Sequence, residues 1–230
     1  MTQDVVIGYL HGDDVTSPFH HCLFRTFIHD LCGPRRILNF VPVYSNVNIG
    51  GPRNQIVRDF LDTEGGEWLW MLDTDATFPA DLLHNLLAVA DPLEAPIVGA
   101  LTHRLRSTGE LDEQGMPARE IVPVAYQQIK SEAGEWVGYR ELTLHSGDGL
   151  LEVDATGCHC LLVHRSVFEE LRSEHPYPWF RETVLASGIT AGEDITFCLA
   201  ARDAGFPIWI DTRLEAGHVK PFVMTSKGAR

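Results

Sequence analysis

The first hundred residues alternate between short apolar runs and segments in which apolar side chains recur at helical spacing. The runs, each as long as a buried strand, are residues 5–10, 37–44, 68–72 and 97–101. The helical segments are residues 20–31, 52–61 and 79–90. Short apolar runs predict strands, and apolar residues three and four apart predict helices. The alternation therefore predicts an α/β fold with a mostly parallel sheet and helices on both faces.

The rest of the chain has a different pattern. Residues 106–119 are polar and interrupted by glycine and proline, which predicts a loop, and residues 121–129 and 136–144 predict a hairpin. A strand over 160–164, a helix over 166–172, a helix over 193–204 and a strand over 207–211 follow. We expect a single domain, 1–230, in which a nucleotide-binding type of half, 1–105, precedes a smaller mixed half, 106–230.

The charge balance limits the kinds of partner. Basic residues number 18 and acidic residues 32, which gives a net charge of −14. A surface this negative repels phosphate backbones, so nucleic acid is not expected as a sequence-general partner. A small anionic ligand would need a local cation to hold it.

Cysteine usage and hydropathy predict a reduced, cytoplasmic protein without a membrane span. The five cysteines are an odd number, which fits free thiols better than a disulfide framework. The Cys158-His159-Cys160 tripeptide has no second cysteine pair and so lacks the spacing of a zinc site. The acidic N-terminus does not have the pattern of a signal peptide, and no apolar run has the length of a membrane helix.

Asp73-Thr74-Asp75 follows the apolar run 68–72. Residues two apart on an extended chain point the same way, so both carboxylates face one site. Ligands of open α/β sheets bind beyond the carboxyl ends of strands. Two carboxylates there suit a divalent ion such as Mg²⁺ or Mn²⁺. The alternative is a solvated turn in which aspartate caps a backbone amide, and because a DxD triplet is short, its position carries the argument.

Two further motifs carry candidate chemistry. Glu193 and Asp194 begin a predicted helix, where acidic residues either cap the helix or act as a general base toward an acceptor hydroxyl. His218 follows the last predicted strand, where it either packs at the surface or completes the coordination of an ion through a neutral imidazole.

Taken in order, the DTD triplet, the segment GEDITFCLAARDAGFPIWID and the segment AGHV resemble the glycosyltransferases of the GT-A fold, in particular those similar to family 2. The resemblance spans roughly residues 5–218 and implies a Rossmann-like sheet with the metal-binding DxD motif at Asp73, Thr74 and Asp75. It implies that Mn²⁺ or Mg²⁺ binds a nucleotide-diphosphate sugar, that His218 is a further metal ligand, and that Asp194 of the acidic pair with Glu193 is the base of inverting members.

The same resemblance implies contacts for other segments. Gly8, Tyr9 and Leu10, with His11, would border the nucleotide base. Arg53 and Asn54 would lie near the donor, where Arg53 or Arg58 would neutralise phosphate. For Arg58 a surface ion pair is the favoured alternative. The loop at Gly157 would border the donor and acceptor sites, since a small residue lets backbone amides approach a sugar or phosphate; a tight turn is the alternative. The first-strand loop, His11-Gly12-Asp13-Asp14, departs from the family pattern and leaves the base, uracil or guanine, open.

Three aromatic residues, Tyr177, Trp179 and Phe180, lie in the irregular segment before the acidic pair. They suit either an acceptor platform, because aromatic rings stack on sugar faces, or the packing of a long loop.

The sequence thus favours a metal-dependent glycosyltransferase of the hexosyltransferase class. It would move a sugar from a UDP- or GDP-sugar to the hydroxyl of a glycan, protein or small-molecule acceptor. Inversion is favoured over retention, in which the same metal triad would serve and the acidic pair would have another role. The alternatives are a sugar nucleotidyltransferase and a catalytically silent sugar-binding module. The acidic loop 11–14 in place of a basic phosphate loop disfavours the first, and retention of both carboxylates, the acidic pair and His218 disfavours the second.

Overall fold

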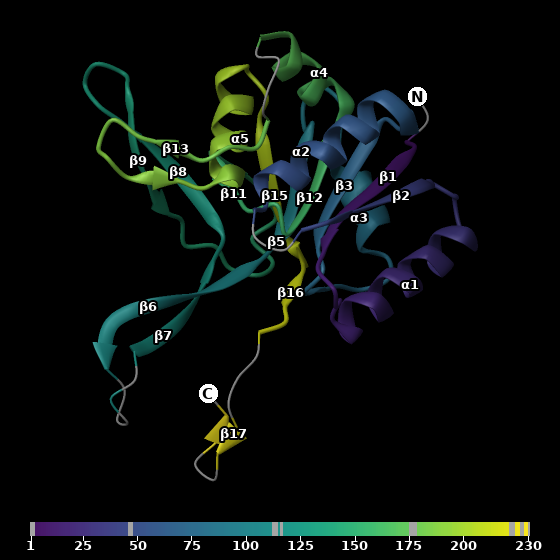
Figure 1. Cartoon of the computed structure of the whole chain (residues 1–230), viewed down its shortest axis with the longest axis horizontal. Helices are drawn as coiled ribbons and strands as arrows, with labels where there is room; N and C mark the ends of the chain where they lie inside the picture. Colours follow the sequence, from purple (N-terminus) through teal and green to yellow (C-terminus); the bar gives the residue numbers. More distant parts are fainter. Residues whose placement is uncertain are drawn as a thin grey trace.

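The computed structural model describes residues 3–45, 48–111, 115, 117–174, 179–220, 224–225 and 228–229. A seven-stranded sheet lies at its centre (Figure 1). From edge to edge its strands are β10 (Leu150–Val153), β15 (Ile208–Glu215), β5 (Ile97–Leu101), β12 (Cys160–His164), β3 (Trp68–Asp73), β1 (Val5–His11) and β2 (Ile37–Tyr44).

The sheet is mixed, which corrects the prediction of a mostly parallel one. Strands β2, β1 and β3 pair in parallel, and so do β5 and β15. Strand β12 runs antiparallel to both of its neighbours, β3 and β5, and β10 runs antiparallel to β15. The apolar run 160–164 shows that a buried strand is present but not its direction, because burial is the same either way.

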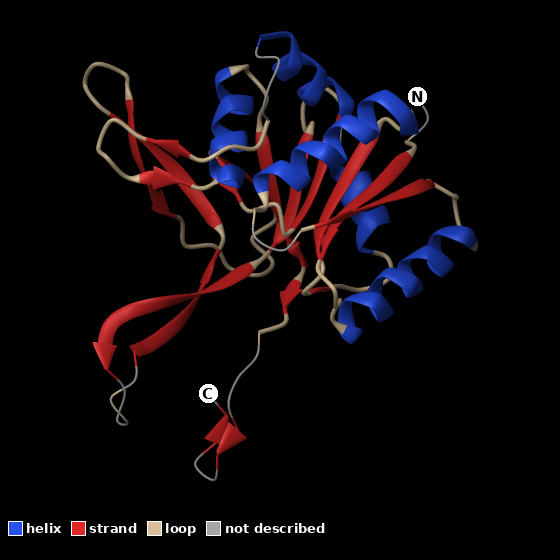
Figure 2. Ribbon diagram, viewed as in Figure 1, coloured by secondary structure: helices blue, strands red, loops and turns tan. Residues whose placement is uncertain are grey.

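Helices cover both faces of this sheet (Figure 2). Helices α1 (Ser17–Leu31) and α3 (Leu82–Val89) lie on one face. Helices α2 (Gly50–Asp59), α4 (Arg165–Glu174) and α5 (Glu193–Asp203) lie on the other, and the π-helical turn η1 (Phe60–Glu64) continues α2. None of the helices in the part of the chain that is described is long and apolar enough to cross a membrane.

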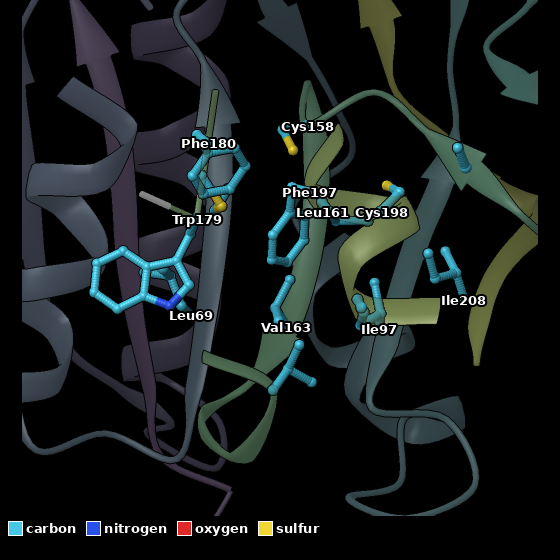
Figure 3. Close-up of a cluster of buried hydrophobic side chains, with 14 of the residues drawn as sticks. Leu69, Ile97, Cys158, Leu161, Val163, Trp179, Phe180, Phe197, Cys198 and Ile208 are labelled. Atoms are coloured by element: carbon cyan, nitrogen blue, oxygen red, sulfur yellow. The ribbon is translucent and has the colours of Figure 1, made fainter. Parts of the chain in front are cut away.

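Strand β3 shows how the sequence builds both layers. Its side chains alternate between the faces, so Trp68 and Trp70 pack with α1 and α3 while Leu69 and Met71 pack on the opposite side. On that opposite side Phe197 of α5 stacks on Phe180, with ring centroids 4.7 Å apart (Figure 3). A fully apolar strand is therefore needed here, because neither face meets water.

The remaining strands lie outside the main sheet. Strands β6 (His103–Leu111) and β7 (Pro117–Pro123) form a long hairpin that projects from the body of the protein (Figure 1), so the prediction of a loop over 106–119 is wrong. Strands β8 (Ala125–Lys130) and β9 (Trp136–Glu141) form the predicted hairpin, which β11 (Ala155–Thr156) extends. Three two-residue pairs complete the set: β4 (Ala76–Thr77) with β16 (Gly217–His218), β13 (Thr183–Val184) with β14 (Thr190–Ala191), and β17 (Met224–Thr225) with β18 (Gly228–Ala229).

Helix boundaries differ from the predicted ones where capping decides them. Helix α1 begins at Ser17 rather than residue 20, because the Thr16 hydroxyl accepts a hydrogen bond from the Phe19 amide and Pro18 occupies the first turn. Helical spacing of apolar residues over 20–31 predicts that Ile28 and Leu31 face the core, and this is wrong, since both are exposed. Strand β10 carries no alternation that would predict it.

Candidate functional site

The end of strand β3 and the C-terminal part of the chain meet through a short strand pair. Asp73 is the last residue of β3, and Ala76, just beyond Asp75, pairs with His218 in the β4–β16 ladder. The Val219 amide donates to the Asp75 carbonyl oxygen at 2.8 Å. Backbone pairing therefore holds His218 beside the DTD triplet, more than 140 residues away in sequence.

The Asp75 carboxylate lies among basic groups. Its Oδ2 atom is 2.9 Å from Nε2 of His218 and 2.9 Å from Nζ of Lys220. Burial tends to raise the pKa of Asp75, but its contacts with His218 and Lys220 outweigh burial and hold the pKa below its usual value. Asp75 is therefore ionised at neutral pH and available to a cation.

His159 joins this cluster because β12 runs antiparallel to β3. Cys160 pairs with Leu72, so the preceding residue lies opposite Asp73, whose amide donates to the His159 carbonyl at 3.1 Å. The His159 ring is buried, and its Nδ1 atom lies 3.4 Å from Oδ2 of Asp73 and 3.5 Å from Oδ1 of Asp75. Among the described residues no hydrogen bond of good geometry reaches that nitrogen.

Burial tends to lower the pKa of His159, yet the neighbouring carboxylates, Asp73 above all, raise it overall. The site thus favours positive charge at this point. His159 is not among the metal ligands predicted from the sequence. The signal that would have found it is strand direction, because only an antiparallel β12 brings its N-terminal end to the DTD triplet.

The other nitrogen of each histidine faces a backbone carbonyl. Nε2 of His159 is 3.0 Å from the Gly217 oxygen, and Nδ1 of His218 is 3.2 Å from the His103 oxygen. The two rings are neighbours, with centroids 4.1 Å apart.

The residues of this cluster fit a divalent metal ion. Ligand atoms of Asp75, His159 and His218 all lie within 4.8 Å of one another. A carboxylate oxygen and imidazole nitrogens, with a second carboxylate at Asp73, form a donor set that binds divalent ions. The structure thus brings Asp75 and His218 into one cluster, and holds Asp73 beside it.

Arg53 forms ion pairs with two of the candidate carboxylates. Its buried guanidinium lies 3.0 Å from Oδ1 of Asp73 and 2.6 Å from Oε1 of Glu193. Burial tends to lower the pKa of Arg53, but the Asp73 charge and its acidic neighbours raise it. Burial tends to raise the pKa of Asp73, and the charge of Arg53 lowers it well below its usual range. The guanidinium predicted to neutralise phosphate is thus engaged with carboxylates of the protein itself.

Asn54 fixes the segment that precedes the acidic pair. Its side-chain amide donates to the Phe180 carbonyl at 2.8 Å, and its Oδ1 accepts from the Phe180 amide at 2.9 Å. Trp179 and Phe180 are both buried in the core of Figure 3, where the Trp179 indole donates to the Phe168 carbonyl. Both aromatic side chains therefore pack in the core, and Tyr177 lies outside the described residues.

The two members of the acidic pair have different surroundings. Glu193 is held by Arg53. In the described part of the chain, the one hydrogen bond to the Asp194 carboxylate is a 2.8 Å bond to Oδ1 from the Ile195 amide. Burial raises the pKa of Asp194, although the charge of Arg53 opposes the rise. A Cβ atom at Gly157 would lie 3.4 Å from Oδ2 of Asp194, so the glycine leaves room beside this carboxylate.

Two cavities share Ile49 in their walls. The first has a volume of about 460 Å³ and is lined by residues from the first strand end, the DTD triplet and the C-terminal segment: Leu10, His11, Gly12, Ser45, Ile49, Asp73, Thr74, Asp75, His218 and Lys220. The second has about 710 Å³, with Asn54, Phe180 and Glu193 in its wall. Both have the size of a ligand site.

The four residues predicted to border the nucleotide base all lie in strand β1, and two of them, Leu10 and His11, are in a cavity wall. Gly8 is buried under α2, where an added Cβ would meet Ile56 at 2.4 Å. Tyr9 packs edge to face on Phe19, with ring centroids 5.5 Å apart. Gly8 and Tyr9 therefore shape the strand beneath the pocket.

Comparisons with known proteins identify the fold. No family model matches the chain, and no curated protein sequence matches it. Among solved structures, A197 from STIV is 15% identical with a TM-score of 0.55, over 98% of this chain and 91% of that one. GalNAc-T7, crystallised with UDP, GalNAc and Mn²⁺, is 11% identical with a TM-score of 0.57, over 94% of this chain and 43% of that one. The chain thus spans less than half of GalNAc-T7. At these identities the likeness shows a glycosyltransferase-like α/β fold.

Proposed function

We propose that the protein is a metal-dependent glycosyltransferase that moves a sugar from a nucleotide-diphosphate sugar to an acceptor hydroxyl, with inversion at the sugar carbon. One observation carries the proposal: Asp73, Asp75 and His218 meet at the end of β3, in the wall of a ligand-sized cavity. The likeness to GalNAc-T7 supports it, because that protein was crystallised with UDP and Mn²⁺.

Asp73, Asp75 and His218 would hold Mn²⁺ or Mg²⁺. A bound divalent ion would neutralise the diphosphate and stabilise the charge of the departing nucleotide. Such an ion matters for a protein of net charge −14, which would otherwise repel the donor. Lys220 brings an ammonium group to the same cavity and would supply a further positive charge for phosphate.

The donor, a UDP- or GDP-sugar, would occupy the first cavity, with its diphosphate at the DTD triplet and its base toward Leu10 and His11. The acceptor would enter through the second cavity, whose wall contains Glu193. Ile49 lines both cavities, so donor and acceptor would approach each other beside the acidic pair.

Asp194 would act as the general base. The acceptor oxygen forms a bond to the sugar carbon as the bond from that carbon to the diphosphate oxygen breaks, and the hydroxyl proton passes to the Asp194 carboxylate. Asp194 suits this role better than Glu193, because Glu193 is ion-paired with Arg53 and the raised pKa of Asp194 favours proton uptake.

The direct test is nucleotide release from a panel of UDP- and GDP-sugars, with Mn²⁺ or with EDTA. We expect one donor to be turned over with Mn²⁺ only, and turnover to be lost in Asp75→Ala. Asp62→Ala is a matched control, because Asp62 is ion-paired with Arg172 outside both cavities and its loss leaves turnover intact.

Failure to bind or turn over any donor in the presence of metal would contradict the proposal. Pyrophosphate-dependent exchange into the sugar nucleotide would identify a nucleotidyltransferase instead.

A further inference from the structure

The tautomers of His159 and His218 follow from their backbone contacts. A carbonyl oxygen only accepts hydrogen bonds, so Nε2 of His159, facing the Gly217 oxygen, and Nδ1 of His218, facing the His103 oxygen, each carry a proton. A neutral imidazole has one N–H. The remaining nitrogen of each ring therefore presents a lone pair, and both of these nitrogens face Asp75.

Lone pairs that face carboxylate oxygens repel them unless positive charge lies between. A single divalent ion satisfies both nitrogens and the carboxylate together. It also gives a partner to Nδ1 of His159, a buried nitrogen with no hydrogen bond among the described residues.

The contacts on the far side of each ring support metal binding. Histidine ligands regularly donate their second N–H to a carbonyl or carboxylate, which fixes the tautomer and the ring orientation. Both rings here have such a carbonyl partner. Their exposures differ, since the His159 side chain is 7% exposed and that of His218 is 22% exposed, so His159 is the more deeply anchored of the two.

We propose that His159 is a metal ligand together with Asp75 and His218, and that this two-imidazole donor set selects a transition-metal ion such as Mn²⁺ or Co²⁺ over Mg²⁺. The inference rests on the proposed function and names the class of its ion. Imidazole favours transition metals, and their affinities at such sites rise from Mn²⁺ to Co²⁺, whereas Mg²⁺ prefers oxygen ligands and retains its water.

The first test is metal affinity in the absence of any sugar nucleotide. Calorimetric titration of metal-free protein should show binding of Co²⁺ that is tighter than that of Mn²⁺, and binding of Mn²⁺ at least about tenfold tighter than that of Mg²⁺. His159→Gln should weaken Mn²⁺ binding about 10- to 100-fold and Mg²⁺ binding by less than about threefold. His84→Gln is the matched control, because His84 also pairs with an aspartate, Asp30, and should leave the affinities unchanged.

The second test uses the unaltered protein and does not depend on the folding of a variant. Pulsed electron paramagnetic resonance of Mn²⁺ bound to protein labelled with ¹⁵N-histidine should detect two directly bonded imidazole nitrogens. Detection of a single bonded imidazole nitrogen, or equal Mn²⁺ affinity in wild type and His159→Gln, would overturn the assignment of His159 as a ligand.

The outcomes separate this inference from the function on which it rests. If Mn²⁺ binding is lost in Asp75→Ala but not in His159→Gln, the metal-dependent function stands and the role of His159 falls. If the unaltered protein binds no divalent metal, both fall.

Discussion

Two carboxylates of this protein, Asp30 and Asp75, each meet histidine, and their other partners differ. Asp30 in α1 is 3% exposed; its Oδ1 accepts from the Arg36 amide at 2.8 Å and lies 2.8 Å from Nε2 of His84, and its Oδ2 accepts from the Ile37 amide at 3.0 Å. The Asp75 side chain is 30% exposed and meets no backbone amide among the described hydrogen bonds. Its partners are side chains of the C-terminal segment and the buried ring of His159.

The difference separates a carboxylate that stabilises the fold from one that is available for binding. Backbone amides have fixed positions, so Asp30 closes the connection from α1 to β2, and its burial keeps it from a ligand. The partners of Asp75 are side chains, and a metal ion can take the place of the Lys220 ammonium group beside it. Asp194 extends the series, since it has the fewest partners and a raised pKa.

The largest expected effect is that of Asp75→Ala. Removing the carboxylate at the centre of the cluster should weaken Mn²⁺ binding by at least about 100-fold and reduce turnover to background. The free energy of unfolding of the metal-free protein should change by less than about 1 kcal/mol, because partly exposed ion pairs contribute little. Isothermal titration measures the Mn²⁺ affinity, and urea unfolding measures the free energy of unfolding. A large loss of stability with intact metal binding would show that Asp75, like Asp30, stabilises the fold and does not bind the metal.

Asp194→Asn tests the carboxylate that has the fewest hydrogen-bond partners of these three. We expect kcat to fall about 10²- to 10⁴-fold, as for loss of a general base, with Mn²⁺ affinity retained. Glu193→Gln is the paired variant. It weakens a contact to Arg53 and should lower kcat by less than Asp194→Asn does.

The same Asp194→Asn variant makes a prediction about stability. A folded-state pKa raised above the unfolded value means that ionisation of Asp194 opposes folding as the pH rises above about 4. Asp194→Asn should therefore raise the free energy of unfolding at pH 7 relative to wild type.

For the kinetic prediction, equal kcat in wild type and Asp194→Asn, measured by nucleotide release, would remove Asp194 from the mechanism.

Asp30→Ala should have the opposite profile to Asp75→Ala. It leaves the Arg36 and Ile37 amides without their acceptor, which should lower the free energy of unfolding by about 2–4 kcal/mol. Mn²⁺ affinity should stay within about twofold of wild type, since Asp30 is remote from the cluster. Urea unfolding checks the first value, and metal titration of the folded variant checks the second.

The pH dependence of stability sharpens the same comparison. Burial tends to raise the pKa of Asp30, but hydrogen bonds from His84 and two backbone amides lower it overall. A folded-state pKa below that of the unfolded state stabilises the protein at pH values above the unfolded pKa. This stabilisation is lost as the pH falls below about 4. Urea unfolding from pH 7 to pH 3 should therefore show a shallower loss in Asp30→Asn than in wild type. Parallel curves would show that Asp30 contributes no charge-dependent stability.

The smallest expected effect is that of Lys220→Ala. Loss of one phosphate-directed charge from a half-exposed position should weaken donor binding about 3- to 10-fold at low salt, and less at high salt because screening reduces the contribution. Lys130→Ala, on strand β8, is the control and should have no effect. Donor affinity that is unchanged at low salt would place the diphosphate away from Lys220.

Much of the fold was predictable because it depends on local pattern. The runs 5–10, 37–44, 68–72 and 97–101 are strands in the structure, and the helix that begins at Glu193 is confirmed. The long hairpin of β6 and β7 was not predictable in this way, because its side chains are mostly exposed and carry no apolar alternation. Glycine and proline in a polar segment indicate a turn, but they do not show whether paired strands flank it.

The candidate site was predictable only in part, for a topological reason. Asp73 and Asp75 follow a recognisable strand, so their place at the end of the sheet follows from local sequence. His159 precedes its strand, and a parallel β12 would place it at the opposite end of the sheet. Its position beside Asp73 depends on strand pairing between segments nearly ninety residues apart, which local periodicity does not encode. The catalytic and metal-binding roles of all these residues stay predictions.

The most direct test of the central claim is to locate the metal. Crystals grown with Mn²⁺ and UDP, measured at a wavelength where manganese scatters anomalously, should show one strong peak within bonding distance of Asp75 and His218. The diphosphate should lie on its open side in the first cavity. A peak elsewhere, or UDP bound away from the DTD triplet with no metal, would contradict the account.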